Sequence, residues 1–224
     1  FPYPTPSGCG VILNVEKGGL GDTTDIQSAV NSLPVNLSTS SCVVVRDTQT
    51  YSEQVTVRGF TNNGHQIKIM ADPSFVSSAP LISPPALSTA AFLIQNASVT
   101  LVGINVLAAS AMPYGVSASS AYLRISSVSV DGQDKIYSAG ISLGGWSALD
   151  YSSITVQAAH ALALSSSVGT AVSFSTAQSN GASSRALYLL GSSSNTFTAF
   201  LANNSAGDGA GFFIDSNYNT VSQS

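Results

Sequence analysis

The chain has 224 residues, of which 44% are hydrophobic and only 8% are charged, and its formal net charge is −4. This hydrophobic fraction with so little charge excludes a disordered protein, and seven Lys and Arg residues are too few for an extensive nucleic-acid surface. No apolar run approaches the ~20 residues of a membrane-spanning helix, so neither nucleic-acid binding nor membrane insertion is expected.

The N-terminal end contains three early prolines and a cysteine. Prolines at positions 2, 4 and 6 predict an extended segment over residues 1–8, followed by one domain over residues 9–224. Cys9 and Cys42 each precede a β-rich segment, so we expect a disulfide between them; two buried free thiols are the alternative. Two cysteines are too few to bind a metal. Disulfide chemistry, many Ser and Thr and few charges indicate a secreted or cell-surface protein.

One segment has the pattern of an α-helix, at about residues 24–33. Thr23, Thr24 or Asp25 can cap its start, and Pro34 follows its end. Its apolar stripe consists of Ile26, Ala29, Val30 and Leu33. The terminal unit of a solenoid needs a cap with a polar outer face, and we expect this helix to provide it, with Gln27, Ser28, Asn31 and Ser32 facing water.

Short strands follow the helix. Residues 42–45, 54–57 and 66–70 are rich in β-branched residues and are separated by turn-forming residues. Four prolines at positions 73, 80, 84 and 85 then interrupt the pattern. Because proline cannot donate within a sheet ladder, residues 71–89 are expected to loop out of the domain.

The C-terminal half repeats itself with a period of about 25 residues. The repeating segments are Ala161–Leu164, Ala186–Leu189 and Gly211–Ile214, and in phase with them Thr170–Ser173, Asn195–Thr198 and Asn219–Ser222. Such a period indicates a repeat architecture, and short apolar strings divided by Ser, Asn and Gly clusters indicate strands and turns. The pattern extends back to Ala91, so we expect an all-β, right-handed parallel β-helix of about seven coils.

The ends of the repeats suggest two further features. Asn195 and Asn219 suit left-handed corners or side-chain ladders, or serve only as turn formers.

The pattern stops in mid-coil near Ser224, so we expect the chain to continue or a neighbouring chain to cover the last coil. Self-association at the coil ends is the partnership that this predicts.

The segment over residues 22–70 resembles a known family. Asp25–Pro34, Val43–Arg46 and Thr50–Val57 are similar to the opening of pectinesterase-like and pectate-lyase-like right-handed parallel β-helices. The resemblance implies a cap helix followed by the first coils; the catalytic residues of that family lie on later coils. The Ser-, Ala- and Asn-rich coils that follow also resemble repeat regions of large bacterial surface proteins.

One later segment, Asp131–Tyr137, resembles a pectinesterase catalytic string. The resemblance implies Gln133 as an oxyanion donor and Asp134 as the acid or base, while the alternative is a polar turn between two strands. The strings that carry the family's second Asp and its Arg are absent, and Asp150 and Arg185 are the nearest substitutes. Asp131 and Asp134 are too few acids for a lyase-type calcium site, so no metal or other cofactor is expected.

Several aromatic residues suggest a sugar-stacking surface, with burial inside the coil as the alternative. The candidates for carbohydrate binding are Trp146, Tyr137 and Tyr114, with Tyr122 and Tyr151 as further members of this surface. The two histidines, His65 and His160, have no His, Cys or acidic neighbours in the sequence that suggest a site, and His160 is expected to be structural.

These patterns favour a non-catalytic structural or adhesive module, self-assembling end to end into an extracellular filament. The missing catalytic strings and the sustained repeat carry this expectation. The alternatives are a polysaccharide-active enzyme, either a carbohydrate esterase or a polysaccharide lyase, and a carbohydrate-binding module. A polysaccharide is therefore a second possible partner.

Overall fold

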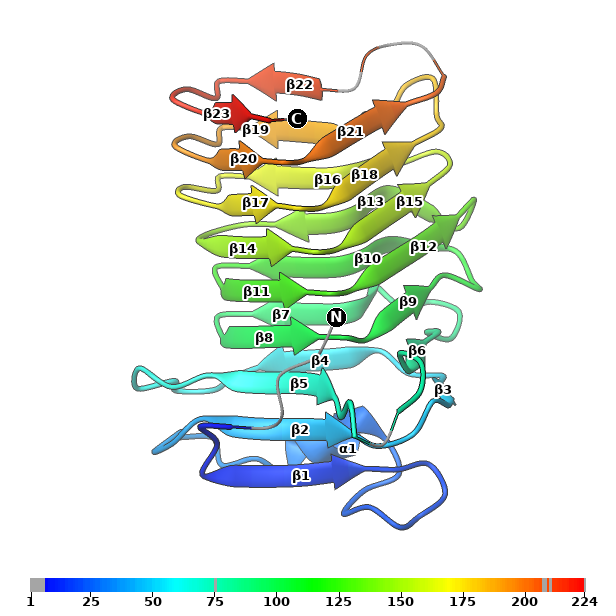
Figure 1. The fold of residues 1–224 in the computed structure, drawn as a ribbon, viewed down its shortest axis with the longest axis vertical. Helices are drawn as coiled ribbons and strands as arrows, with labels where there is room; N and C mark the ends of the chain where they lie inside the picture. The colour runs from blue at the N-terminus through cyan, green and yellow to red at the C-terminus, as the bar shows by residue number, and fades with distance from the viewer. Residues whose placement is uncertain (1–6, 75, 207–208, 210, 224) are drawn as a thin grey trace.

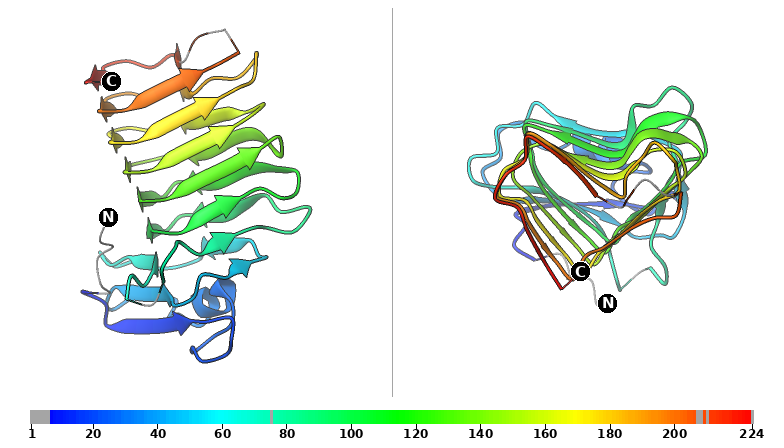
Figure 2. Two further views of the ribbon diagram at one scale, coloured as in Figure 1. Left: turned by 45° about the vertical axis from the view of Figure 1, so that its right-hand side comes forward. Right: turned by 90° about the horizontal axis from the view of Figure 1, so that it is seen from above.

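The computed structural model describes residues 7–74, 76–206, 209 and 211–223, and these form a parallel β-solenoid of about seven turns (Figure 1). Seen from above, three sheets form the sides of a roughly triangular coil (Figure 2). The strands at the front of Figure 1 run to the right and the chain returns to the left behind them while it rises, which makes the solenoid right-handed. This confirms the predicted fold class.

Each coil contributes a strand to the three sheets in turn, and the strands pair in parallel with those of the next coil. The first sheet consists of β1 (Val11–Val15), β2 (Ser41–Val45), β5 (Ile67–Ala71), β8 (Ser98–Val102), β11 (Tyr122–Ser126), β14 (Ser147–Asp150), β17 (Ala171–Ser173), β20 (Thr196–Thr198) and β23 (Thr220–Ser222). The second sheet consists of β3 (Thr50–Tyr51), β6 (Leu81–Ile82), β9 (Asn105–Leu107), β12 (Ser129–Gln133), β15 (Ser153–Val156), β18 (Thr176–Ser179) and β21 (Leu201–Asn204). The third sheet consists of β4 (Val55–Arg58), β7 (Ala90–Gln95), β10 (Met112–Ser119), β13 (Ile136–Leu143), β16 (His160–Ser165), β19 (Leu187–Leu190) and β22 (Gly211–Ile214).

The core consists of columns of apolar side chains that run along the solenoid. In the first sheet, Val43, Ile69, Leu101, Ile125 and Leu149 lie in register on five successive strands, and all five are fully buried. Successive side chains of a strand point to opposite faces, so the residues between them point outward. The alternation in the sequence therefore decides which residues can form a surface site.

In the later coils, a left-handed residue turns the chain from the first sheet to the second. Ser127, Tyr151, Phe174 and Ala199 occupy this corner in four successive coils, with φ angles of 55°, 47°, 47° and 48°. This conformation is unusual for a bulky residue. Tyr151 and Phe174 stack with their ring centroids 5.1 Å apart and an interplanar angle of 5°, a contact that contributes about 1 kcal/mol and offsets part of the strain.

The asparagines at the turn before β20 and β23 form a side-chain ladder. The Asn195 Nδ2 group donates to Asn219 Oδ1 at 2.9 Å, and Asn195 Oδ1 accepts from the Thr170 backbone N–H at 2.9 Å. The left-handed residues are instead their predecessors, Ser194 and Tyr218, with φ angles of 58° and 56°. Of the alternatives that the sequence left open, the ladder is the one that the structure contains.

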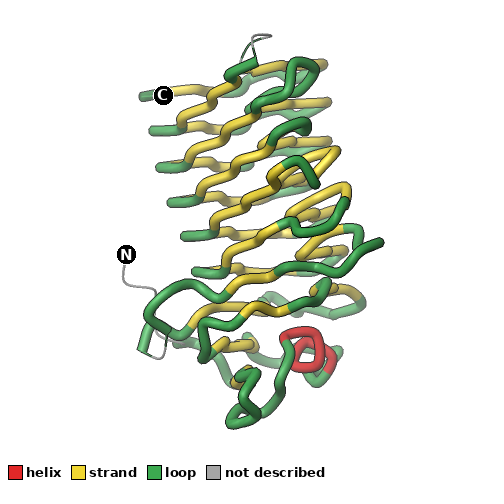
Figure 3. The backbone as a smooth tube through the Cα atoms, turned by 90° about the vertical axis from the view of Figure 1, so that its right-hand side faces the viewer, coloured by secondary structure: helices red, strands yellow, loops and turns green. Residues whose placement is uncertain are grey.

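The helix α1 (Ile26–Asn31) lies at the N-terminal end of the solenoid (Figure 3). Asp25 is its N-cap, because its carboxylate accepts from the Ser28 N–H at 2.7 Å. Ile26, Ala29 and Val30 are buried against the end of the core. Gln27 does not simply face water as expected: its Oε1 accepts from the Thr56 N–H, which joins the helix to β4.

Glu53 satisfies the first turn of α1 from outside the helix. Its carboxylate oxygens accept from the N–H groups of Ile26 at 2.9 Å and Gln27 at 2.8 Å. Burial raises the pKa of Glu53, and these two N–H groups act in the opposite direction. The hydrogen bonds therefore stabilise the helix start, which otherwise leaves its first N–H groups without partners.

Replacing Glu53 with alanine is expected to lower the free energy of unfolding by about 2 kcal/mol, because two partly buried N–H groups lose their acceptor. Glu53→Gln retains one acceptor oxygen without a buried charge, and we expect it to lose less. Urea unfolding of the two variants measures this, with Glu16→Ala as the control for removing a carboxylate. Equal stability of wild type and Glu53→Ala contradicts the assignment.

The proline-rich segment differs from the predicted loop. Within residues 71–89, β6 (Leu81–Ile82) pairs with β3 on one side and with β9 on the other, so the coil continues through it. Pro80 precedes this strand, and Pro84 and Pro85 follow it after one residue. Because the prolines flank the strand, β6 keeps the backbone N–H groups that the ladder requires.

Cys9 and Cys42 form a disulfide, with their Cα atoms 5.8 Å apart. Cys42 lies on the outer face of β2, in a small apolar cluster with Val44, Met70 and Val102. The bond therefore attaches the N-terminal segment to the outside of the first sheet. Residues 1–6 of the predicted extended segment lie outside the described residues.

Candidate functional site

The surface richest in chemically useful groups is the outer face of the first sheet. Its strands present outward side chains in columns, because the strands are in register. One column contains Lys68 on β5, Thr100 on β8 and Arg124 on β11. The next column contains Met70, Val102 and Ser126 on the same strands.

A groove of about 520 Å³ crosses these strands. We call it the first-sheet groove. Its residues are Ser7, Gly64, His65, Gln66, Lys68, Met70, Ser98, Thr100, Val102, Tyr122, Arg124 and Ser126. The turn before β5, which contains His65 and Gln66, forms one wall. Ser7, from the segment that the disulfide attaches, lies beside Lys68.

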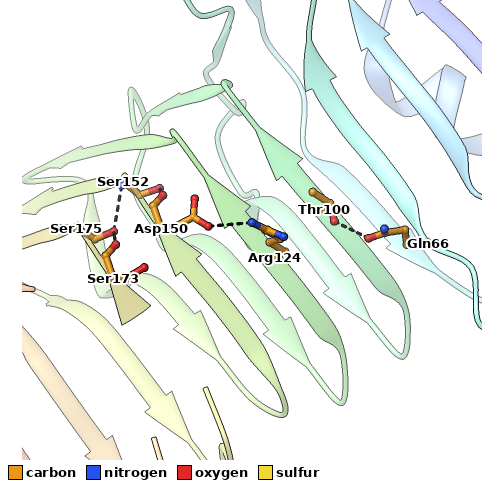
Figure 4. Close-up of polar contacts among 7 residues, drawn as sticks. All are labelled: Gln66, Thr100, Arg124, Asp150, Ser152, Ser173 and Ser175. Carbon is orange, nitrogen blue, oxygen red and sulfur yellow. Dashed lines mark hydrogen bonds and ion pairs between the residues drawn. The ribbon is translucent and has the colours of Figure 1, made fainter. Parts of the chain in front are cut away.

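Hydrogen bonds hold the polar groups of the groove in place (Figure 4). The Thr100 hydroxyl donates to Gln66 Oε1 at 2.7 Å. The Lys68 Nζ group donates to the Ser7 carbonyl at 2.9 Å. Thus the turn and the N-terminal segment are both joined to the groove floor through outward side chains.

The same outer face continues as an ion pair, and buried serines at the corner between the first and second sheets join the next coils by hydrogen bonds. Arg124 Nη2 lies 3.3 Å from Asp150 Oδ2, with the Arg124 side chain 56% exposed and the Asp150 side chain 16% exposed (Figure 4). One coil further, the Ser152 N–H donates to Ser175 Oγ at 3.1 Å, and that hydroxyl donates to the Ser173 carbonyl at 2.8 Å. On the described strands β17 and β20, the outward residues Ala171, Ser173, Thr196 and Thr198 carry no charge, so this face is uncharged there beyond Asp150.

The predicted catalytic cluster lies on a different sheet. Asp131 and Gln133 belong to β12 of the second sheet, and Asp134 follows it. Asp131 Oδ1 accepts from the Gln133 N–H at 3.1 Å, which is an interaction within the turn. The Lys135 ammonium hydrogen-bonds Asp134 and holds its pKa below the usual range. A general acid that works near neutral pH needs the opposite shift.

The substitutes for the missing catalytic residues do not join this cluster. Asp150 is on β14 of the first sheet and pairs with Arg124. Arg185 precedes β19 of the third sheet, and its Nη1 donates to the Ser184 carbonyl at 2.9 Å. The five candidate residues are thus distributed over three sheets.

The predicted sugar-stacking residues also lie on different elements. Trp146 is 64% exposed in the turn before β14, and its ring lies over Gly169. Tyr137, on β13, is 63% exposed, and Tyr114, on β10, is half-buried. None of these three lines the first-sheet groove. Tyr122, at the start of β11, does line it and is 49% exposed.

Sequence reasoning missed Gln66, Lys68, Thr100 and Arg124 as one site. Their spacing gave no regular signal, since 32 residues separate Lys68 from Thr100 but 24 separate Thr100 from Arg124. From the sequence, only the outward positions of Lys68, Thr100 and Arg124 within their own strands could be predicted. The proline-rich insertion between β5 and β8 is the reason for the unequal spacing.

His160 belongs to the third sheet and is half-buried. Its Nδ1 accepts from the Arg185 backbone N–H at 3.1 Å, and its ring stacks on Tyr188 at a centroid distance of 4.3 Å. Burial, assisted by the Arg185 charge, lowers the pKa of His160 below 6.5. These contacts require the neutral imidazole, because a protonated Nδ1 cannot accept a hydrogen bond.

Acidification is therefore expected to destabilise the protein through His160. Because the pKa of His160 is lowered in the folded protein, the unfolded chain binds a proton at this residue more readily than the folded chain does. The stability that neutral His160 contributes is therefore lost as the pH falls through 6.5. Urea unfolding at about pH 7.5 and about pH 5.5 measures the loss. We expect a smaller difference between the two conditions in His160→Gln. An unchanged difference in that variant contradicts the assignment, with His65→Gln as the control.

Within the described residues, no group of three or more His, Cys, Asp or Glu side chains is arranged to hold a metal ion. No helix in the described part of the chain is long and apolar enough to span a membrane.

The chain matches no protein-family model, and no curated protein shows significant similarity to it.

Proposed function

We propose that the chain is a non-catalytic structural and adhesive module of a secreted or cell-surface protein. The observation that carries this proposal is the unbroken parallel pairing of strands in the three sheets. Each coil is hydrogen-bonded to the next, from β1 to β23 in the first sheet. Repeats stacked in this way act as a rigid spacer that presents an extended surface.

The composition of the surface supports an extracellular location. Only 8% of the residues are charged, and outward positions of the later coils are occupied by Ser and Thr, as at Thr196 on β20 and at Thr220 and Ser222 on β23. The Cys9–Cys42 disulfide adds support, because disulfides persist in oxidising compartments and are rare in the cytosol.

The distribution of acidic residues favours a non-catalytic role over the enzyme alternative. General acid–base chemistry requires two groups within reach of the same substrate atoms. Asp131 and Asp134 belong to the second sheet, whereas Asp150 belongs to the first sheet and is occupied by Arg124. Pectinesterase-like or lyase-like catalysis would need partners that these positions do not bring together.

Two measurements test the proposal. Incubation with a panel of methylated and unmethylated polysaccharides is expected to release neither methanol nor unsaturated sugars. Release of either product would establish an esterase or a lyase, and Asp134→Asn and Asp150→Asn would then assign the active carboxylate. Small-angle scattering with light scattering is expected to give an elongated particle, and the same data report whether copies associate through the coil ends. A compact particle contradicts the spacer role.

A further inference from the structure

A second groove follows the corner between the first and second sheets. It has a volume of about 640 Å³ and lies where β11, β14, β17 and β20 end (Figure 1). We call it the corner groove. It extends from Ser127 and Tyr151 past Phe174 to Ala199 and Leu201. None of the described residues that line it is an Asp, Glu, Lys or Arg. Because a charged ligand would lose water there without gaining a partner, the groove suits an uncharged one.

The corner residues form one column along this groove. The strands before the corner pair in register, so Ser127, Tyr151, Phe174 and Ala199 follow at equivalent positions, about 4.8 Å apart. All four have left-handed φ angles, and the backbone N–H of each donates to a carbonyl of the next coil. The backbone therefore repeats at the strand spacing, and it presents one side chain to the groove at each level.

Two of these positions carry an aromatic ring in spite of a conformational cost. A left-handed backbone is strained for Tyr151 and Phe174, whereas a glycine, as at Gly103 in the same column, adopts it without strain. Strained residues of this kind gather at ligand sites. The two rings are nearly parallel, with centroids 5.1 Å apart, and Phe174 remains 56% exposed. The corner thus presents a flat apolar ring to solvent.

The column has room for a further ring beside Phe174. One face of the Phe174 ring is stacked on Tyr151, and the next level of the column, at Ala199, contains only a methyl group. Leu201, at the start of β21, is 59% exposed beside this level. A planar ring at the Ala199 level continues the stack at the spacing that Tyr151 and Phe174 already have. Offset stacking favours a flat π-system over a saturated ring.

The polar part of the lining indicates what the ring carries. Thr176, on β18, pairs in register with Leu201 and lines the groove. Its hydroxyl group can both donate and accept a hydrogen bond. An uncharged ring with one hydroxyl group, a phenol, therefore matches the apolar surfaces of Phe174 and Leu201 and the polar group beside them.

We propose that the corner groove binds an uncharged planar phenolic ligand, whose ring stacks on Phe174 at the level of Ala199. Leu201 contacts the edge of the ligand ring, and Thr176 hydrogen-bonds its hydroxyl group. Tyr151 is a positioning residue, because its ring holds that of Phe174 parallel to the stack. The site goes beyond the structural role proposed above and does not depend on it. Scattering tests the spacer role, so a failure of ligand binding leaves that result intact.

A ligand-observed NMR titration with 2-naphthol, a flat uncharged phenol, tests the proposal. Wild-type protein is expected to bind 2-naphthol, and to bind decahydro-2-naphthol, which has the same carbon skeleton and hydroxyl group but puckered rings, about fivefold more weakly. Phe174→Leu retains an apolar side chain without the ring, and we expect it to weaken 2-naphthol binding about fivefold. Ala199→Phe places a ring in the open level and is expected to abolish binding.

The matched control is Tyr137→Leu, which removes an exposed ring from β13 of the third sheet and is expected to leave the affinity unchanged. Circular dichroism of each variant verifies that it is folded. The comparison of the two ligands needs only wild-type protein, so it remains decisive if a corner variant is unfolded.

Four results would overturn the proposal. The first is no binding of 2-naphthol to wild-type protein. The second is equal binding of 2-naphthol and its saturated analogue, which would indicate a general apolar surface. The third is equal weakening by Tyr137→Leu and Phe174→Leu, which would indicate nonspecific contact with exposed rings. The fourth is tighter binding of methyl glucoside than of 2-naphthol, which would assign the groove to a sugar.

Discussion

Replacing Phe92 with alanine is expected to lower the free energy of unfolding by about 4 kcal/mol. Phe92 is fully buried on β7, between Val55 of β4 and Val116 of β10 in the third sheet. Its ring therefore packs within the central stack, where the coils above and below limit any collapse into the space left by the ring. A cavity that cannot close adds to the lost apolar burial.

Guanidinium unfolding of Phe92→Ala and Leu93→Ala measures this effect. Leu93 is the next residue on β7, but it points outward and is only half-buried. Its truncation is expected to cost below about 1 kcal/mol. Equal losses in the two variants would mean that the inward and outward faces of β7 are misassigned.

Removing the disulfide with Cys9→Ala and Cys42→Ala together is expected to cost about 4 kcal/mol. The bond closes a loop with a sequence separation of 33 residues, and cross-linking such a loop restricts the unfolded chain by about that amount. The loop contains β1, α1 and the start of β2, so the loss is expected to be greatest in the capping coil.

Reduction of the wild-type protein provides the matched experiment. A thiol reductant is expected to lower wild-type stability to that of the double alanine variant and to leave the variant unchanged. Identical unfolding of oxidised and reduced wild-type protein would show that the bond contributes no stability. Mass spectrometry before unfolding verifies the oxidation state of each sample.

The coil architecture could be predicted from the sequence because its signals are local and repeated. Alternation of apolar and polar residues decides which side chains of a strand point inward, and the 25-residue period between Ala161 and Ala186 indicates the length of a coil. The cap helix was readable for the same reason, since Asp25, the apolar stripe and Pro34 lie within one short segment. The observed helix, Ile26–Asn31, is shorter than the predicted range of residues 24–33, because Asp25 and Ser32 are its N-cap and C-cap residues.

The proline-rich segment shows where local reasoning fails. Four prolines between residues 71 and 89 indicated a loop, but two residues between them, Leu81 and Ile82, complete the second sheet. A two-residue strand has no periodicity of its own. Its existence depends on β3 and β9, which supply hydrogen-bond partners on both sides.

By itself, the sequence determined the parallel coils, their inward faces, the cap helix and the pair of cysteines. Only the tertiary structure decided which outward residues meet, such as Lys68 with Thr100 and Arg124 with Asp150. The physical reason is that neighbours on a solenoid surface belong to successive coils, and the number of residues per coil varies with the loops between strands. A groove built across strands therefore has no fixed spacing in the sequence, whereas the core of each strand does.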